Sequence, residues 1–472
     1  MIDLRGKRIL VLGLGVHGGG LGVARFMVEQ GARVRVTDMK DAAALQSSLA
    51  ALEGLPITTT LGEHREEDFA WADLVVRNPA VPRESPWLAL ARRLGKPVLM
   101  ELSLFAALCP APIIGVTGTK GKTTTATWTW EMVRRAYPDA VLAGNLRVSA
   151  LEQLPRIRPE SRVVLEMSSW QLEGTDEARW SPPLAAITNL SPDHLNRYRD
   201  MDDYGEAKFA ILRHQRPDDW GVLNADDVRV RAFAKRAPGH IAWFGGVTAR
   251  AAEWGPGVYL EGADVVWYPA EAGRTVLAGA EEIPLPGVHN RLNACCAAQL
   301  ALLAGVPVDA VRESLCAFHG VPDRLELVAT VGGVRFYNDT TATTPAATLV
   351  ALEALREPII LIAGGADKRS DFSELAPAVA ARCRGVVLLE GTATPALLAA
   401  LEQAGAPILA REDNFARAIR AAQAAARPGD AVLLSPGCAS FGMFANEFDR
   451  GEQFRRIVGT LAADQVAAGG TA

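Results

Sequence analysis

The sequence has no uninterrupted run of about 18 apolar residues, so we expect no transmembrane helix. Its first residues lead straight into a strand-like run and lack the apolar core and cleavage site of a signal peptide. Six cysteines in 472 residues, none of them in a CxxC pair, are too sparse for a disulfide scaffold. We expect free thiols, mostly small buried side chains, in a reducing cytoplasm.

The sequence also has no excess of positive charge, because it contains 49 lysines and arginines and 54 acidic residues, for a net charge of −5. Proteins that bind nucleic acid usually carry an excess of positive charge, so we expect no nucleic-acid partner. At about 150 residues per domain, a chain of this length predicts roughly three domains. Changes of pattern near residues 101 and 320 place these domains at 1–101, 102–320 and 321–472.

Short apolar runs alternate with alanine-rich stretches of helical character along most of the sequence. Residues 8–12, 111–116 and 358–363 are examples of these runs, which suit strands buried on both faces of a parallel sheet. The alternation predicts an α/β fold with mainly parallel sheets. Residues 240–285 lack a helical period and predict a small β excursion.

The first glycine-rich loop lies between a predicted strand and a predicted helix. Gly13, Gly15 and Gly18 satisfy GxGxxG, and Asp38 ends the next strand 20 residues later. Unpaired amides at a helix N-terminus favour a phosphate there, and His17 is either a phosphate donor or an exposed loop residue. The loop fits NAD(P), another nucleotide phosphate or a purely structural turn.

The second glycine-rich loop, residues 117–124, reads TGTKGKTT and also follows a predicted strand. Val116 stands where the strict P-loop pattern has its first glycine, but Gly121, Lys122 and Thr123 are intact. Backbone amides can wrap the phosphates, Lys122 can reach the terminal phosphates, and a threonine hydroxyl can face Mg²⁺. Two phosphate-binding loops in one chain favour an ATP-dependent enzyme whose other substrate also carries phosphate.

From this loop onward the sequence resembles the Mur ligase superfamily, which also includes folylpolyglutamate synthases. The further matching elements lie at 144–145 (GN), 164–173 (VLEMSSWQLE), 189–198 (NLSPDHLNRY), 204–208 (YGEAK), 287–294 (GVHNRLNA), 322–326 (PDRLE), 338–339 (ND), 364–368 (GGADK) and 435–440 (SPGCAS). Residues 164–173 are similar to the branch of the family that adds D-glutamate. The resemblance spans nearly the whole chain, and it implies that the first glycine loop serves UDP rather than NAD.

The resemblance implies an ATP-dependent amide ligase of peptidoglycan precursor synthesis. ATP would phosphorylate the terminal carboxylate of UDP-N-acetylmuramoyl-L-alanine, and the amine of D-glutamate would attack the acyl phosphate, releasing phosphate besides ADP. Negative charge gathers in this reaction, so Mg²⁺ (or Mn²⁺) and cationic side chains should stabilise it. The implied domains bind UDP, ATP and glutamate in chain order, in a cytoplasmic monomer with small-molecule partners and no membrane insertion.

The site residues are assigned by the same resemblance. The catalytic residues are Lys122, His194, Lys208 and Lys368. The ATP site comprises Gly118, Thr119, Lys120, Gly121, Lys122, Thr123, Thr124, Thr125, Asn293, Arg324 and Asp339. The UDP-substrate site comprises Gly15, His17, Gly18, Asp38, Lys40, Asn78, Asn145, Ser168 and Gln171. Glutamate would contact Thr343, Lys368, Ser440 and Phe441, and the metal would contact Thr123, Glu166, His194 and carbamylated Lys208.

Some of these residues have simpler interpretations. His194 would otherwise be a structural histidine at a helix start, and Lys208 an ordinary surface lysine. The residues around UDP would otherwise be solvated surface.

Three positions depart from the family pattern. Thr341 replaces the usual lysine, Thr344 the usual asparagine and Glu447 a frequent phenylalanine, which leaves D- versus L-glutamate open. Lys120, where the family usually has asparagine, adds a cation, and we hypothesise that it compensates; Lys120→Asn should then lower turnover sharply.

Other functions remain to be weighed against this one. Another Mur-type ligase or a polyglutamate ligase would keep the same chemistry. An NAD(P)-dependent oxidoreductase is supported only by the GxGxxG match. A non-catalytic nucleotide-binding regulator would not need Lys122, Glu166, His194 and Lys208 together.

Overall fold

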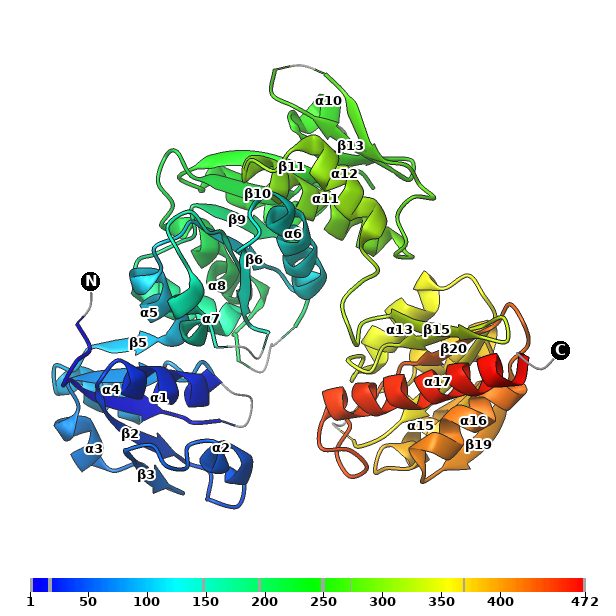
Figure 1. Ribbon diagram of the computed structural model, residues 1–472, viewed down its shortest axis with the longest axis horizontal. Helices are drawn as coiled ribbons and strands as arrows, with labels where there is room; N and C mark the ends of the chain where they lie inside the picture. Colours follow the sequence, from blue (N-terminus) through cyan, green and yellow to red (C-terminus); the bar gives the residue numbers. More distant parts are fainter. Residues whose placement is uncertain are drawn as a thin grey trace. The chain divides into compact units, whose positions relative to one another are not determined.

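The structure is a computed structural model that describes residues 3–15, 19–146, 149–193, 197–247, 251–271, 273–367 and 370–469. Three sheets alternate with helices, which confirms the α/β prediction (Figure 1). The chain forms two compact units, one of residues 1–283 and 289–317 and one of residues 284–288 and 318–472. The first two sheets lie in the first unit and the third sheet lies in the second.

The first sheet contains five parallel strands in the order β3-β2-β1-β4-β5. Its strands are β1 (Arg8–Leu12), β2 (Arg33–Asp38), β3 (Ile57–Leu61), β4 (Leu74–Arg77) and β5 (Val98–Met100), with helices α1 (Gly19–Glu29), α2 (Gln46–Ala50), α3 (Glu66–Trp71) and α4 (Pro86–Arg93). The strand order reverses direction between β1 and β4. Open α/β sheets bind ligands at the carboxyl ends of the strands beside such a reversal.

The central sheet has nine strands in the order β14-β13-β12-β11-β10-β9-β6-β8-β7. They are β6 (Ile113–Thr117), β7 (Val141–Gly144), β8 (Val163–Glu166), β9 (Leu184–Ile187), β10 (Trp220–Asn224), β11 (His240–Gly245), β12 (Gly257–Glu261), β13 (Asp264–Tyr268) and β14 (Thr275–Ala278). Pairing is parallel up to β12, whereas β13 and β14 are antiparallel, which is the predicted β excursion. The helical elements are α5 (Glu101–Leu108), α6 (Lys122–Ala136), η1 (Leu151–Arg156), α7 (Ser169–Glu177), α8 (Met201–Arg213), α9 (Val228–Ala232), η2 (Phe233–Lys235), α10 (Ala251–Trp254), α11 (Val288–Leu303) and α12 (Val308–Ala317).

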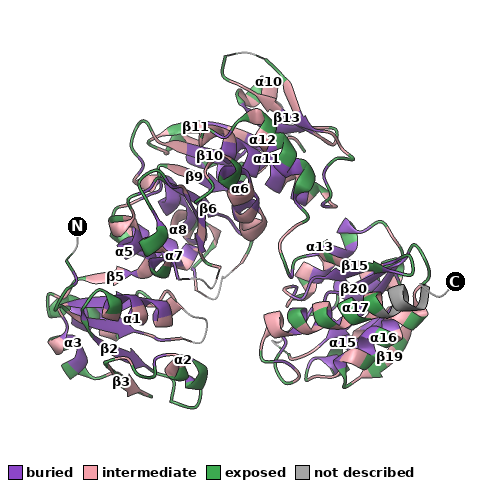
Figure 2. Ribbon diagram, viewed as in Figure 1, coloured by how far each residue is buried: buried purple, intermediate pink, exposed green. Residues whose placement is uncertain are grey.

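The third sheet has six strands in the order β15-β16-β20-β17-β18-β19, of which β15 is antiparallel to its neighbour. They are β15 (Glu326–Val331), β16 (Val334–Asn338), β17 (Ile359–Gly364), β18 (Cys383–Leu389), β19 (Ile408–Glu412) and β20 (Ala431–Leu434). Its helices are α13 (Pro345–Ala354), α14 (Leu375–Arg382), α15 (Thr394–Gln403), α16 (Phe415–Ala425) and α17 (Glu447–Gly469). Strand β17 is buried along its whole length, as its continuous apolar sequence predicts. Figure 2 shows buried residues concentrated in the sheets and exposed residues on loops and outer helix faces.

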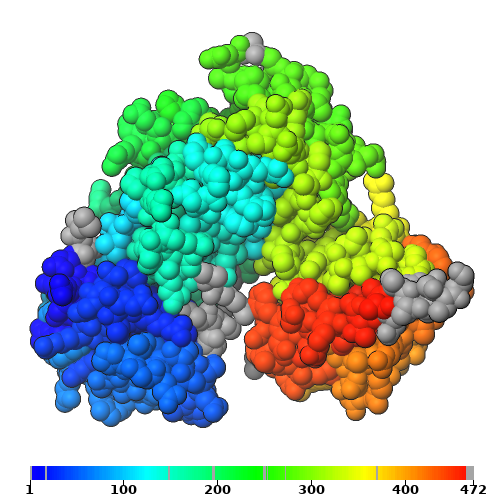
Figure 3. All heavy atoms as spheres, in the orientation of Figure 1, coloured from blue at the N-terminus to red at the C-terminus, as the bar shows by residue number. Residues whose placement is uncertain are grey.

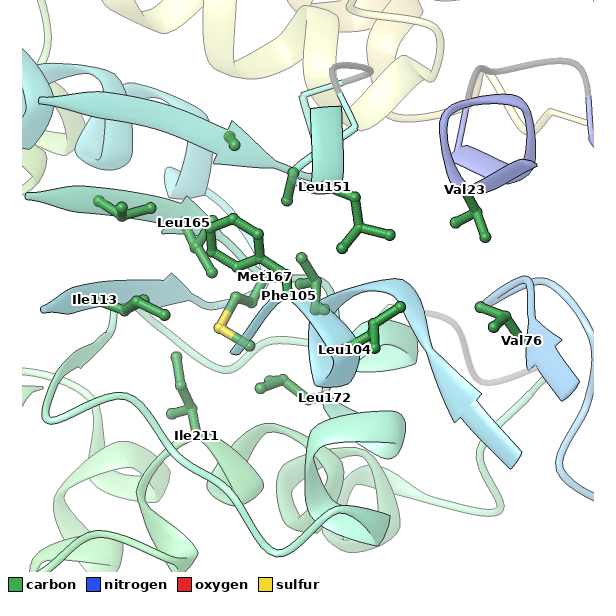
Figure 4. Close-up of a cluster of buried hydrophobic side chains, with 14 of the residues drawn as sticks. Val23, Val76, Leu104, Phe105, Ile113, Leu151, Leu165, Met167, Leu172 and Ile211 are labelled. Carbon is green, nitrogen blue, oxygen red and sulfur yellow. The ribbon is translucent and has the colours of Figure 1, made fainter. Parts of the chain in front are cut away.

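One hydrophobic core runs through both sheets of the first unit. Val23 of α1 and Val76 of β4 belong to the same buried cluster as Phe105 of α5 and Leu165 of β8 (Figure 4). Each such buried side chain contributes about 1.5–3 kcal/mol relative to exposure. The first sheet and the central sheet are therefore packed as one body, and their surfaces abut in the space-filling view (Figure 3).

The six cysteines are free thiols, as expected. Cys295, Cys296, Cys383 and Cys438 are buried, whereas Cys316 is exposed. No helix among the residues that the structure describes is long and apolar enough to cross a membrane.

Candidate active site

The second glycine loop connects β6 to the N-terminus of α6. Gly121 caps this helix with a φ of 81°, and a Cβ there would lie 2.3 Å from Oδ1 of Asn293. Only glycine fits this position, because the backbone is left-handed and the side chain of Asn293 is in contact with it. The fold thus brings Asn293 of α11 to the loop. Thr125, in the first turn of α6, donates to the same Oδ1 at 3.4 Å.

A short segment after β9 holds the loop in place. The Lys120 amide donates to Oδ1 of Asn189 at 2.9 Å, and the Asn189 amide group donates back to the Lys120 carbonyl at 2.9 Å. The Thr188 hydroxyl donates to the same carbonyl at 2.6 Å. The exposed Lys120 ammonium lies 3.4 Å from Asp193. The motif that begins at Asn189 therefore braces the loop, a role that its residue types alone do not indicate.

Lys122 opens α6, and Thr123 and Thr124 follow it in the first turn. The Lys122 ammonium donates to the Thr119 carbonyl at 2.9 Å. The first amides of a helix lack partners within the helix and carry the positive end of its dipole. An anion at the carboxyl end of β6 would be stabilised by these amides.

Glu166 ends β8 beside this loop, with a residue exposure of 1%. Its Oε1 accepts from the Asn145 side chain at 2.8 Å, while its Oε2 has no hydrogen-bond partner among the described residues. The glycine–asparagine turn fits against the end of β8, since a Cβ on Gly144 would lie 2.2 Å from the Glu166 carbonyl. A buried carboxylate oxygen without a donor is suited to a hard cation such as Mg²⁺.

The described residues contain no group of three or more His, Cys, Asp and Glu side chains placed to hold a metal. His194, one of the predicted ligands, lies outside the described residues. The other predicted ligands, Thr123, Glu166 and Lys208, lie within the described residues.

Lys208 is 1% exposed, so its interpretation as a surface lysine is wrong. Helix α8 places its ammonium 2.8 Å from the Gly118 carbonyl and 4.6 Å from the ring centroid of Tyr204. Burial, reinforced by the charge of Lys122, lowers the pKa of Lys208 well below its usual value. The neutral amine is the form that can react with CO₂, so the environment favours the predicted carbamylation.

The residues of the first sheet that we predicted to contact UDP lie at the carboxyl ends of β1, β2 and β4. Asp38 is buried, and its two oxygens accept from the amides of Gly15 at 3.0 Å and Lys40 at 2.9 Å. The Asn78 side chain lies against the backbone of Gly13 and Gly15. Interpretation of Asp38 as solvated surface is therefore wrong, although Lys40 is exposed. His17 and Gly18 lie outside the described residues.

Ser168 and Gln171 have a structural task at the start of α7. The Ser168 hydroxyl accepts from the Gln171 amide at 3.2 Å, and the Gln171 side chain accepts from the Ser168 amide at 2.9 Å. This reciprocal capping box is legible in the sequence as S-x-x-Q before a helix, although we assigned the pair only to substrate.

The second unit gathers its own predicted residues at the carboxyl ends of β16, β17 and β20. Asp339 accepts from the Leu325 amide at 3.1 Å and from the Ser435 hydroxyl at 2.8 Å, and burial raises its pKa to about 7. The Gly437 amide donates to the Ala342 carbonyl at 2.9 Å, which brings the loops of Thr343 and Ser440 together.

The remaining predicted residues of this unit are less enclosed. Arg324 and Phe441 are exposed, Ser440 is buried, and Lys368 lies outside the described residues. The Ala366 amide donates to the Ala439 carbonyl at 2.8 Å, so the segment leading to Lys368 runs beside that leading to Ser440.

Sequence interpretation also missed Arg450, which is fully buried on α17. Its Nε donates to the Thr340 hydroxyl and its Nη2 to the Thr340 carbonyl, both at 2.9 Å. The contact spans 110 residues, and no local pattern indicates it.

Comparison with known protein families identifies relatives of this chain. Three family models match the chain, described as a Mur ligase MurD-like N-terminal domain at residues 7–100, a Mur ligase middle domain at 116–301 and a Mur ligase glutamate ligase domain at 323–438. With these three matches in chain order, the chain belongs to the Mur ligase family.

Within that family the chain is similar to proteins named UDP-N-acetylmuramoylalanine--D-glutamate ligase. The one from Roseiflexus sp. (strain RS-1) is 51% identical over 462 residues, which cover 97% of this chain and 99% of the relative. The one from Symbiobacterium thermophilum is 40% identical over 97% of this chain and 98% of its own length.

Solved structures show the same fold at low sequence identity. The UDP-N-acetylmuramate-alanine ligase MurC from Thermotoga maritima has a TM-score of 0.62 and 20% identity, covering 96% of this chain and 99% of that chain. The MurF ligase from Thermotoga maritima, solved in complex with ADP, has a TM-score of 0.58 and 16% identity, covering 98% and 100%.

Proposed function

We propose that the protein uses ATP to couple D-glutamate to UDP-N-acetylmuramoyl-L-alanine in cytoplasmic peptidoglycan precursor synthesis. The observation that carries this proposal is the cluster at the carboxyl edge of the central sheet, where the phosphate loop, Glu166 and Lys208 come together. The names of the two curated relatives support the choice of donor and acceptor. We assign UDP to residues 1–101, ATP to 102–320 and glutamate to 321–472 of a monomer.

The reaction needs activation because a carboxylate is a poor electrophile. Transfer of the γ-phosphoryl group of ATP to the substrate carboxylate gives an acyl phosphate and ADP. The glutamate amine then attacks the acyl carbon, loses a proton and expels phosphate to form the amide. Negative charge accumulates in both steps, so fixed cations and amide dipoles supply the main stabilisation.

The phosphate loop carries the first step. The amides at the start of α6 would hold the phosphates of ATP, and Lys122 would exchange the Thr119 carbonyl for the terminal phosphates. Asn293 would contact the nucleotide from the far side of Gly121. We also assign Arg324 and Asp339 to ATP binding, as the family resemblance implies.

The residues at the carboxyl edge fit a divalent cation, Mg²⁺ or Mn²⁺. Glu166 offers the unpartnered Oε2, and Thr123, His194 and carbamylated Lys208 would be the other ligands. When bound, the cation would neutralise phosphate charge. Before modification Lys208 is a poor ligand, since its amine donates to the Gly118 carbonyl.

The substrates would be held by the two remaining groups of residues. Thr343, Lys368, Ser440 and Phe441 would bind glutamate, with Lys368 pairing a carboxylate. The UDP-linked substrate would contact Gly15, His17, Gly18, Asp38, Lys40, Asn78, Asn145, Ser168 and Gln171. The amide dipoles of the first glycine loop favour its pyrophosphate.

The test is phosphate release by the purified protein with ATP, UDP-N-acetylmuramoyl-L-alanine and each amino acid in turn. We expect release that depends on D-glutamate, together with a new UDP-linked product of matching mass. Release with L-glutamate instead would revise the stereochemistry, and no release with any amino acid would refute the proposal.

Glu166→Gln is the matched inactive control. It keeps an acceptor for Asn145 but removes the charge that would hold the cation, so turnover should fall by about 100-fold or more. Because the substitution removes a buried charge, the variant should fold at least as stably as the parent protein.

A further inference from the structure

Between the first sheet and the central sheet lies a buried group of charged side chains that the reaction scheme does not use. Arg77 ends β4, directly before Asn78, and its side chain is fully buried. Its Nη1 donates to the Val81 carbonyl at 3.0 Å, which closes the loop that contains Asn78. Its Nη2 lies 3.4 Å from Glu177 and 3.8 Å from Glu173, both on α7 of the central domain.

Glu173 in turn contacts two residues of the segment that follows Asn189. Its carboxylate accepts from Arg197 at 2.9 Å and 3.3 Å and from the Tyr198 hydroxyl at 3.2 Å. The guanidinium carbon of Arg197 lies 4.4 Å from the ring centroid of Trp170, a residue of α7. This stacking holds the Arg197 side chain against α7. Arg197 also belongs to the segment that starts at Asn189, the residue that braces the phosphate loop.

Helix α7 itself starts three residues after Glu166, so only a short stretch of chain separates the helix from the end of β8. Arg77 thus connects the end of β4 to the same helix whose start lies beside the proposed cation ligand. A buried arginine is destabilising unless carboxylates and carbonyls compensate its charge, so the geometry tolerates little displacement.

We propose that Arg77 is a positioning residue. Through Glu173 it holds the Asn78 loop, at the carboxyl end of the first sheet where UDP would bind, in a fixed position relative to the ATP loop. The inference rests on the proposed function, because it assumes that UDP binds at that loop. The substrate bound there must present its carboxylate to the γ-phosphate of ATP. Correct alignment of two bound reactants lowers the barrier, and a misplacement of about 1 Å can cost about 100-fold in rate.

Arg92 provides a matched control for Arg77. It lies at the same distance, 3.4 Å, from the same Glu177 oxygen, but its side chain is 53% exposed and, among the described residues, no hydrogen bond joins it to the Asn78 loop. Exposed ion pairs contribute little, so removing Arg92 should leave both turnover and ligand affinity unchanged.

The experiment compares the parent protein with Arg77→Met, Arg77→Lys, Glu173→Gln and Arg92→Met. For Arg77→Met we expect kcat to fall by about 10- to 100-fold and UDP affinity to fall by about 10-fold, with ADP affinity unchanged. Arg77→Lys should recover part of the loss because it restores the charge beside Glu173. Glu173→Gln should resemble Arg77→Met, and the double variant should be no worse than the poorer single variant.

Calorimetric titration of UDP and of ADP separates the outcomes. If Arg77→Met binds UDP like the parent and keeps its kcat, or if Arg92→Met loses as much, the positioning role is wrong. An equal loss of UDP and ADP affinity would show general damage and also overturn it. If the parent protein binds no UDP at all, the proposed function fails instead.

Discussion

At the scale of single residues, burial decides which groups acquire unusual chemistry. Glu101, at the start of α5, accepts from the Ser149 hydroxyl at 2.6 Å and from the Ala150 amide at 2.8 Å. Burial raises the pKa of this carboxyl to about 7. The residue connects two parts of the first unit through a group that holds a proton near neutrality.

We predict that Glu101 makes the protein less stable as the pH rises. Between its ordinary pKa near 4.5 and the folded value of about 7, the folded state keeps a proton that the unfolded state releases. Stability therefore falls across this window, by up to about 3 kcal/mol, and stays low above it. Glu101→Gln should remove this contribution and be the more stable protein at pH 8, as measured by urea unfolding at pH 5 and pH 8.

Glu313 serves as the control for that measurement. It lies 2.8 Å from Arg135 in an exposed ion pair, so Glu313→Gln should leave the pH slope unchanged. An identical slope for Glu101→Gln and the parent would contradict the assignment.

Single residues also mark the limit of inference from sequence. The YGEAK motif indicates the family role of Lys208, but it does not indicate that the amine is buried. The burial depends on tertiary contacts such as that with the Gly118 carbonyl, 90 residues away in sequence. Arg77 and Glu173 meet across two domains for the same reason. In contrast, Asp38 and Gly15 were predicted together, because the GxGxxG loop and an acidic residue 20 positions later form one fingerprint that local spacing reveals.

At the scale of elements, the second glycine loop is constrained at the point where it enters α6. Gly121 has a left-handed backbone and also touches Asn293, so two separate requirements exclude a side chain. Gly54 has nearly the same backbone, with a φ of 80°, but no described atom lies within 4 Å of the position that a Cβ would occupy there.

These two glycines permit a paired prediction. Gly54→Ala should cost about 1–2 kcal/mol of stability through backbone strain and leave ADP binding intact. Gly121→Ala should carry the same strain, displace Asn293 and weaken ADP binding by more than about 10-fold, measured by titration calorimetry. Equal ADP affinity in the two variants would refute the contact.

Strands and helices were the elements best predicted from sequence. Continuous apolar runs such as those of β1 and β17 correctly indicated strands buried on both faces. For β13 and β14 the sequence predicted only a small β excursion and not their antiparallel pairing. Short strands with no helix between them do not reveal from sequence whether they pair parallel or antiparallel. The capping box at Ser168 was readable but was not used.

At the scale of the whole molecule, the ten tryptophans lie between residues 71 and 267. All of them belong to the first unit, and the second unit contains none. Tryptophan fluorescence therefore follows unfolding of the unit that carries both glycine loops.

We predict that UDP stabilises the whole first unit and not only the first sheet. Because one core runs through both sheets, UDP at 100 times its dissociation constant should raise the stability reported by tryptophan by about 2.7 kcal/mol. Denaturant titration with fluorescence detection measures this shift. If UDP moved only the signal of Trp71 and Trp87, compared through Trp→Phe variants, the sheets would unfold separately.

The shared core also sets where the polypeptide can be divided. A fragment ending near residue 101 would separate Val23 and Val76 from the rest of their cluster, which includes Leu104 of α5 and Leu151 of η1, and would be prone to aggregate. The two halves of such a split should recover activity only when produced together, which would make reconstitution a direct assay for inhibitors of their association.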